Sequence, residues 1–214
     1  MGRQMTLQFF CASGSPFAWR VWLALEHKAI AHDFKMLSFD AGDLETPAYK
    51  AINPRMRVPA IVDDGFALYE SGAILEYLDD KWPREPRLFS ADLKTRALQR
   101  RMVQEADQYV AEAMEKVFAA VGEHGSPDKV AAARKEMSEE VSRWESMIGG
   151  DFLAGGAISA VDFALYPMLA LVQRLAERRA PELAKNLMGP KLSAWMARMK
   201  ALPLVQKTWP PHWQ

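Results

Sequence analysis

The spacing of hydrophobic residues along the chain changes near residue 80. Before that point, short runs of β-branched and aromatic residues alternate with segments whose apolar residues recur every three or four positions, which predicts strands alternating with helices. The expected order is strand, helix, strand, followed by two strands and a helix. The first strand, helix and strand are expected at residues 6–11, 17–28 and 31–37. The next strand is expected at 60–62, another strand after the Asp63-Asp64-Gly65 turn, and the second helix from residue 71.

From residue 93 onward the pattern is helical and carries no strand signal. The stretch before it, 80–91, contains Pro83 and Pro86 among charged residues and suits a linker between domains. The sequence therefore predicts an α/β domain at 1–80, a linker at 81–91 and an all-α domain at 92–214. The long helices of the second domain are expected at residues 93–121, 127–148, 159–179 and 190–202.

Composition narrows the classes of partner and compartment. The 214 residues include 27 basic and 27 acidic side chains, so charge gives no reason to expect nucleic acid or an anionic membrane as a partner. Apolar runs stay well short of the roughly 20 residues of a membrane span. Cys11 is the single cysteine, which makes a reducing cytoplasm the simplest compartment. The histidines share no metal-ligand spacing with one another or with Cys11, so no metal site is expected.

The loop Ser13-Gly14-Ser15-Pro16 separates the first expected strand from the first helix. Ser15 stands where an N-cap is expected, with Pro16 in the first turn. Alternatively, its hydroxyl and the unpaired amides at the helix start would stabilise an anion or a thiolate, a role compatible with capping. A serine nucleophile is disfavoured, because the chain lacks a Gly-x-Ser-x-Gly elbow. Cys11 lies within the expected strand and is interpreted as a buried, inert thiol.

A second group of candidates lies between residues 53 and 75. Pro59 precedes the apolar triplet of an expected strand, a position at which no ladder donor is lost. The Val58-Pro59 bond is either trans, as most such bonds are, or cis. A cis bond would present the backbone of Val58 as an unpaired strand edge, with which a peptide-like ligand could pair in antiparallel fashion.

Glu70-Ser71 precedes the apolar face of the next helix, and Ser71 is expected to be its N-cap. The pair is either an ordinary surface acid beside an ordinary cap, or a site for an α-amino-acid group. In the second case Ser71 and the first helical amides would bind the carboxylate, while Glu70 would face the ammonium group. A capping box formed by Ser159 and Asp162 is interpreted as structural, because it should nucleate a central helix of the second domain.

Taken in order, these segments resemble the soluble glutathione S-transferase family across essentially the whole chain. The resemblance implies a thioredoxin-like domain that binds glutathione, an all-helical domain that supplies much of the second-substrate pocket, and a homodimer. Glutathione would be a co-substrate, with no permanently bound cofactor. The resemblance rests on Ser15-Pro-Phe-Ala-Trp-Arg-Val21, Asn53-Pro-Arg-Met-Arg-Val-Pro59, Glu70-Ser71, and Phe152-Leu-Ala-Gly155 followed by Ser159-Ala-Val-Asp162.

The resemblance also implies roles for individual residues. Val58, followed by a cis Pro59, would pair with the cysteinyl backbone of glutathione. Glu70 and Ser71 would hold its γ-glutamyl group. Arg57 would lie near its glycine carboxylate, and the alternative for this residue is a solvated surface arginine.

The catalytic position follows from the resemblance of the first loop to zeta-like and omega-like members. Ser15 falls on the first catalytic serine of the zeta-like pattern and on the catalytic cysteine of the omega-like pattern, which favours Ser15 over the alternative Ser13. Phe17 stands where zeta-like members carry a cysteine, which argues against a zeta-type isomerase. Asp107, on the long helix, would reach the amino group of the ligand in the partner subunit.

These implied roles describe an enzyme, a glutathione transferase that stabilises the glutathione thiolate for attack on an electrophilic small molecule, as in detoxification. One alternative is a non-catalytic module of the same fold that serves in protein interaction or ligand carriage. Another is a glutathione-dependent isomerase, dehalogenase or peroxidase that uses the same thiolate.

Overall fold

The computed structural model describes residues 7–213 and divides the chain into two compact units. The first unit holds the described residues up to Phe89 together with those from Pro203 onward, and the second comprises Ser90–Leu202. The sequence had assigned residues 203–214 to the helical domain. The described part of that segment instead packs on the first unit, because α10 (Pro203–Lys207) contacts α1 (Pro16–His27). Thr6 and Gln214 lie outside the described residues.

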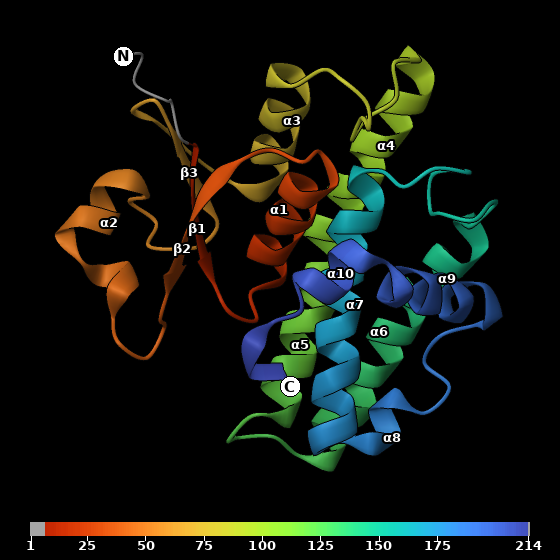
Figure 1. Cartoon of the computed structure of the whole chain (residues 1–214). Helices are drawn as coiled ribbons and strands as arrows, with labels where there is room; N and C mark the ends of the chain where they lie inside the picture. The colour runs from red at the N-terminus through yellow and green to blue at the C-terminus, as the bar shows by residue number, and fades with distance from the viewer. Residues whose placement is uncertain (1–6, 214) are drawn as a thin grey trace, which may run out of the picture. The chain divides into compact units, whose positions relative to one another are not determined.

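In the described residues, the first unit contains a four-stranded sheet with the strand order β2-β1-β3-β4 (Figure 1). The two central strands are β1 and β3, which pair antiparallel, whereas β1 and β2 are parallel and are joined through α1. Parallel neighbours need such a crossover, and a helix supplies it here. The predicted order of strands and helices is confirmed. The strands are β1 (Leu7–Ala12), β2 (His32–Leu37), β3 (Ala60–Asp63) and β4 (Phe66–Tyr69).

The turn between β3 and β4 confirms the hairpin predicted from the sequence. Asp64 has φ of 49° and Gly65 has φ of 85°, so both central residues are left-handed. Two left-handed residues form the turn whose twist matches that of paired antiparallel strands. The register is fixed accordingly, with Asp63 opposite Phe66 and Ala60 opposite Tyr69.

The segment between β2 and β3 contains two short helical pieces. It contains a 3-10 turn, η1 (Asp43–Glu45), and a short helix, α2 (Pro47–Ile52). Thr46 caps α2, because its side chain accepts a hydrogen bond from the Tyr49 amide. The sheet is followed by α3 (Ser71–Lys81), which packs beside α1.

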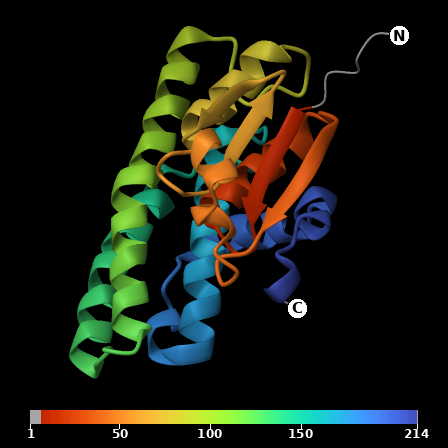
Figure 2. The same cartoon turned by 90° about the vertical axis from the view of Figure 1, so that its left-hand side faces the viewer.

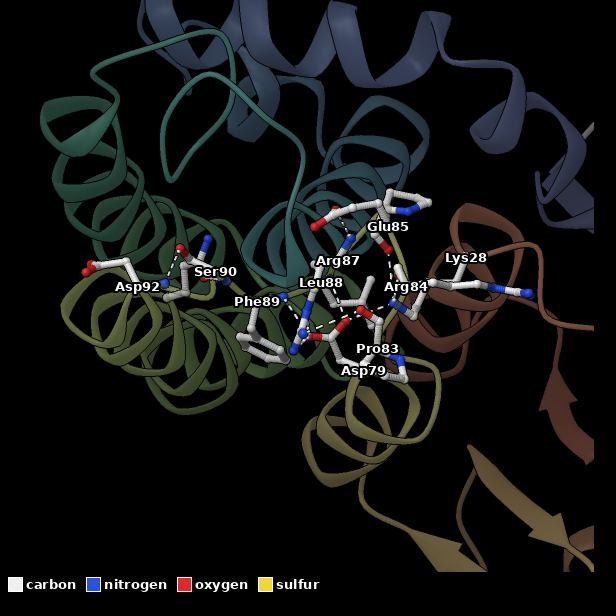
Figure 3. Close-up of polar contacts among 12 residues, drawn as sticks. Lys28, Asp79, Pro83, Arg84, Glu85, Arg87, Leu88, Phe89, Ser90 and Asp92 are labelled. Carbon is white, nitrogen blue, oxygen red and sulfur yellow. Dashed lines mark hydrogen bonds and ion pairs between the residues drawn. The ribbon is translucent and has the colours of Figure 1, made fainter.

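A buried ion pair fixes the segment that follows α3 (Figure 3). Lys28 Nζ donates to Asp79 Oδ1 at 2.9 Å and to the Pro86 carbonyl at 2.9 Å. The Leu88 amide donates to the same carboxylate at 2.8 Å, and Arg87 forms an ion pair with it at 3.2 Å. Buried charges are tolerated when they are paired and hydrogen-bonded in this way. The prolines of the expected linker therefore lie in a fixed connection within the first unit.

The named elements of the second unit, Ser90–Leu202, are all helices, and the long helices predicted from the sequence are confirmed. The helix expected at 93–121 is interrupted by a π-helical segment, and Figure 2 shows the three parts as one continuous green rod. Among the described residues, no helix is long and apolar enough to cross a membrane. The elements are α4 (Leu93–Glu105), η2 (Ala106–Val110), α5 (Ala111–Val121), α6 (Pro127–Met147), α7 (Ala160–Arg179), α8 (Pro181–Ala184) and α9 (Pro190–Ala201).

The capping box at the start of α7 is confirmed, and it has further partners. Asp162 Oδ2 accepts hydrogen bonds from the amide and the hydroxyl of Ser159. Its Oδ1 accepts from the Leu153 amide at 3.0 Å and from Trp195 Nε1 at 2.8 Å. Burial raises the pKa of Asp162, and these hydrogen bonds oppose the rise by favouring the carboxylate. The box therefore ties α9 and the preceding loop to the most buried helix of the unit.

Candidate active site

Ser15 occupies the N-cap of α1, where its backbone is extended and its Oγ accepts a hydrogen bond from the Ala18 amide at 3.2 Å. Pro16 follows at the first helical position, as the sequence predicts. A serine hydroxyl that accepts one hydrogen bond still has its own proton to donate. Ser15 is half-buried, beside the positive end of the α1 dipole. This arrangement favours an anion or thiolate at the start of the helix.

Ser13, the alternative to Ser15, contacts the C-terminal segment of the chain. Its Oγ lies 2.5 Å from Nδ1 of His212. The intervening Gly14 has φ of +87°, and a Cβ at this position would lie 2.6 Å from Cε1 of His212. The sequence had placed this C-terminal segment in the helical domain. Its described residues lie on the loop of the first unit, and His212 was not predicted because the contact joins residues far apart in the chain.

Cys11 and Phe17 are both held by their surroundings. Cys11 is buried in β1, as predicted, and burial raises the pKa of its thiol to about 12. A thiol with so high a pKa carries almost no thiolate at neutral pH. The ring of Phe17 lies under the guanidinium of Arg20, with 5.2 Å between Cζ and the ring centroid.

The Val58-Pro59 bond is cis, and both residues are buried directly before β3. The chain leading to them is held by two hydrogen bonds to one carbonyl. Tyr49 Oη and Asn53 Nδ2 each donate to the carbonyl of Arg57 at 2.7 Å. The side chain of Arg57 is exposed. Buried Asn53 was not singled out from the sequence, although its position before Pro54 in a turn-forming stretch could have pointed to it.

The prediction that Ser71 caps α3 is wrong. Ser71 is the first residue of α3, and Glu70 occupies the N-cap position without a capping side-chain hydrogen bond. The reason is tertiary: Ser71 is buried, and its Oγ accepts a hydrogen bond from Nη1 of Arg20 at 3.3 Å. Glu70 makes the turn with a left-handed φ of 70°, which is unusual for a residue with a side chain.

Glu70 presents an exposed carboxylate beside the start of α3. Arg55 is its neighbour, with 4.0 Å between Nε and Oε1, and both side chains are largely exposed. A pair of this kind contributes little to stability, so the carboxylate can change partner at small cost. Backbone strain at a residue with an exposed charge is a common feature of binding sites.

The structure thus groups most of the predicted site residues in the first unit. Ser13, Ser15 and Phe17 belong to the loop and first turn that follow β1, while Val58, Pro59, Glu70 and Ser71 flank the β3–β4 hairpin. The bond from Arg20 to Ser71 joins the second turn of α1 to the first residue of α3. Asp107 lies elsewhere, in the π-helical segment η2 of the second unit.

Two family models match the chain. The model of the glutathione S-transferase N-terminal domain matches residues 14–81, and that of the glutathione S-transferase C-terminal domain matches residues 107–198. The chain belongs to the glutathione S-transferase family. The resemblance inferred from the sequence is confirmed, and so is the fold class of a thioredoxin-like domain followed by a helical domain.

Similar proteins agree with this assignment to the glutathione S-transferase family. "Glutathione S-transferase A" of Pleuronectes platessa is 28% identical over an alignment that covers 100% of this chain and 94% of that protein. "Maleylacetoacetate isomerase" of Mus musculus is 26% identical over 84% of this chain and 83% of that protein. The crystal structure of a glutathione S-transferase from the Antarctic clam Laternula elliptica has a TM-score of 0.81 and 28% identity, with 97% of this chain and 94% of that chain covered.

Proposed function

We propose that this transferase binds glutathione at the N-terminal turns of α1 and α3, and that Ser15 stabilises the glutathione thiolate for attack on an electrophilic small molecule. The observation that carries the proposal is the geometry of Ser15. Its hydroxyl is fixed by the Ala18 amide and still has a proton to donate, beside the positive end of a helix.

One hydrogen bond is large enough for this role. A free thiol with a pKa of ~8.5 is only about 3% thiolate at pH 7, and lowering that pKa by about two units requires roughly 2.7 kcal/mol. A hydrogen bond to a charged group supplies about 1.5–3 kcal/mol. Ser15 together with the helix N-terminus is therefore sufficient. The serine does not remove the proton itself; it stabilises the anion that attacks.

The remainder of glutathione is assigned to the residues after β2. Val58, before the cis Pro59, would pair with the cysteinyl backbone. Ser71 and the first amides of α3 would bind the γ-glutamyl carboxylate, and the exposed acid of Glu70 would face its ammonium group. The exposed Arg57 would contact the glycine carboxylate. The buried Ser71 and the strained, exposed Glu70 support this orientation.

Ser15 is preferred to Ser13 as the thiolate partner, because Ser13 already contacts His212 at 2.5 Å.

The second candidate function is a glutathione-dependent isomerase, supported by the similarity to maleylacetoacetate isomerase of Mus musculus. Phe17 stands where the resemblance places the cysteine of zeta-like members, which argues against the zeta-type version of that chemistry. Isomerisation, dehalogenation and peroxide reduction would all use the same thiolate.

We also propose a cytoplasmic homodimer that serves in detoxification, with the first unit of one subunit against the second unit of the other. Exposed apolar side chains support it, namely Phe66 on the β3–β4 hairpin with Leu98 and Tyr109 on the long helical rod. In such a dimer Asp107 would approach the ligand amino group of the partner subunit. Sedimentation of the purified protein at the mass of two chains is the expected result, and a single-chain mass would contradict it.

Retention on immobilised glutathione and conjugation of a reactive aryl halide test the proposed function. We expect the wild-type protein to be retained and to conjugate. Ser15→Ala should still be retained but should lose roughly tenfold to a hundredfold in conjugation, the equivalent of one charged hydrogen bond. A wild-type protein that neither binds glutathione nor conjugates the halide would contradict the proposed function.

A further inference from the structure

The C-terminal segment is anchored to α1 by an aromatic cluster. Trp19 Nε1 donates to Thr208 Oγ1 at 2.9 Å, and both residues are buried. The ring of Trp19 also meets the edges of Trp209 and Trp213, with centroids 5.5 and 5.4 Å away. Edge-to-face pairs at these separations are favourable beyond their burial. The segment that carries His212 is therefore held firmly against the first unit.

This anchorage places the His212 ring on the loop before α1. Its Nδ1 lies 2.5 Å from Ser13 Oγ, and its Cε1 occupies the space that a side chain at position 14 would need. The ring itself is set edge-on to Trp213, with 6.3 Å between centroids. His212 thus has one hydrogen bond and one steric contact with two consecutive residues of the loop.

The loop needs such a support, because Gly14 gives it conformational freedom. Gly14 has a left-handed φ of +87°, and glycine populates this region and several others with little cost. Within the loop, the Ser15 amide donates a hydrogen bond to the Ala12 carbonyl at 3.2 Å. A contact from outside the loop would exclude the other backbone conformations that Gly14 allows. This matters because small displacements of a catalytic group lower the reaction rate.

We propose that His212 is a positioning residue of the active-site loop: by holding Ser13 and covering Gly14, it fixes the place from which Ser15 meets the glutathione thiolate. The inference rests on the proposed role of Ser15. It assigns a function in the thiolate site to the C-terminal segment. The opposite role, a lid that must leave before glutathione enters, predicts faster turnover when the contact is removed.

Steady-state kinetics of four variants test the inference: His212→Ala, Ser13→Ala, the double variant, and His212→Asn. His212→Ala should lower kcat by about threefold to tenfold, as expected for one hydrogen bond. The KM for glutathione should stay close to the wild-type value, because Val58, Glu70 and Ser71 are untouched. Ser13→Ala should lower kcat by a similar factor. The double variant should lose no more kcat than the more impaired of the two single variants, because both substitutions remove the same interaction.

His212→Asn is the conservative rescue, because its side-chain amide lies at the same bonded distance from Cβ as Nδ1 of the imidazole. It should recover most of the kcat lost in His212→Ala. Lys207→Ala is the matched control: Lys207 lies in the same segment and pairs with Glu26 at 2.6 Å, away from the loop. It should leave kcat and KM unchanged.

The inference is overturned if His212→Ala has the wild-type kcat, if it turns over faster, or if the losses in the double variant add. A merely structural role would lower the melting temperature without a loss of kcat in the folded protein, and this too would overturn it. If the wild-type protein itself neither binds nor conjugates glutathione, the proposed function fails, and the inference fails with it. These two failures are distinguished by the wild-type measurement alone.

Discussion

Arg20, in the second turn of α1, donates a buried hydrogen bond of 3.3 Å to Ser71, the first residue of α3. A buried guanidinium is costly unless its donors are satisfied, so this bond sets the position of one helix start relative to the other. The proposed thiolate partner precedes α1, and the proposed γ-glutamyl site opens α3. The bond therefore connects the two ends of the proposed glutathione site.

Replacing Ser71 should affect stability and binding together. Ser71→Ala removes the acceptor of a buried donor, so the free energy of unfolding should fall by about 1–3 kcal/mol. Glutathione affinity should fall as well, because the same hydroxyl is assigned to the γ-glutamyl carboxylate. Ser38→Ala is the control: Ser38 is exposed and accepts one backbone hydrogen bond, from Ala41. Denaturant unfolding and calorimetric titration measure both effects, and a wild-type affinity in Ser71→Ala would contradict the assignment.

Glu70 should show a conflict between stability and binding. Its φ of 70° is strained for a residue with a Cβ, and such strain typically costs about 1–3 kcal/mol. Glu70→Gly should therefore unfold at higher denaturant than Glu70→Ala, while both variants lose the carboxylate and bind glutathione more weakly than the wild-type protein. A glycine variant that is less stable than the alanine variant would refute the account of strain.

Asn53 should act on binding through the loop that leads to Val58. Its side chain donates to the Arg57 carbonyl at 2.7 Å and accepts from the Arg55 amide at 3.0 Å. Asn53→Ala removes both hydrogen bonds of a buried side chain and should cost about 1–3 kcal/mol of stability, with a raised KM for glutathione. Tyr49→Phe removes only the second donor to the same carbonyl, so its effect should be smaller. Equal effects of the two variants would argue against this role of Asn53.

The buried pair of Lys28 and Asp79 should make stability fall in acid. Burial alone would raise the pKa of Asp79, but hydrogen bonds from the Leu88 amide and from Lys28, together with the charge of Lys28, hold that pKa below its ordinary value. A carboxyl whose folded pKa is lowered stabilises the protein above its unfolded pKa of ~3.9, and this contribution is lost as the pH falls through and below that value.

Unfolding free energies as a function of pH check this prediction. Lys28→Met removes the fully buried cation of this pair and leaves Arg87 as the remaining cation beside the Asp79 carboxylate, so it should cost up to about 3–5 kcal/mol at neutral pH. The exposed pair of Lys35 and Asp33, at 2.8 Å, is the matched control, and Asp33→Asn should change stability by no more than about 1 kcal/mol. Similar losses from the buried and the exposed pair would contradict the explanation.

Much of the fold could be predicted because its signals are local. Alternating apolar runs predicted the β-α-β and β-β-α order, and the Asp64-Gly65 pair predicted the hairpin turn, whose left-handed backbone these residue types favour. The capping of α1 by Ser15 was also predicted correctly, since an N-cap and the proline after it act within one turn of helix.

The errors lie where distant residues decide the local structure. Ser71 was predicted as an N-cap, but Arg20 from another helix takes its hydroxyl, and Glu70 makes the turn instead. The C-terminal segment was assigned to the helical domain, yet His212 contacts Ser13 across nearly the whole length of the chain. No periodicity or capping rule reports such a contact, because it depends on how completed elements pack.

The titration of the glutathione thiol in the complex tests the central claim most directly. Ultraviolet absorbance of the thiolate is followed against pH in the wild-type protein and in Ser15→Ala. Ser126→Ala serves as the control, because Ser126 also caps a helix whose first residue is proline. We predict a wild-type midpoint below the ~8.5 of a free thiol, unchanged in Ser126→Ala and returned toward the free value in Ser15→Ala. The same midpoint in the wild-type protein and in Ser15→Ala would contradict the assignment of Ser15 as the group that stabilises the thiolate.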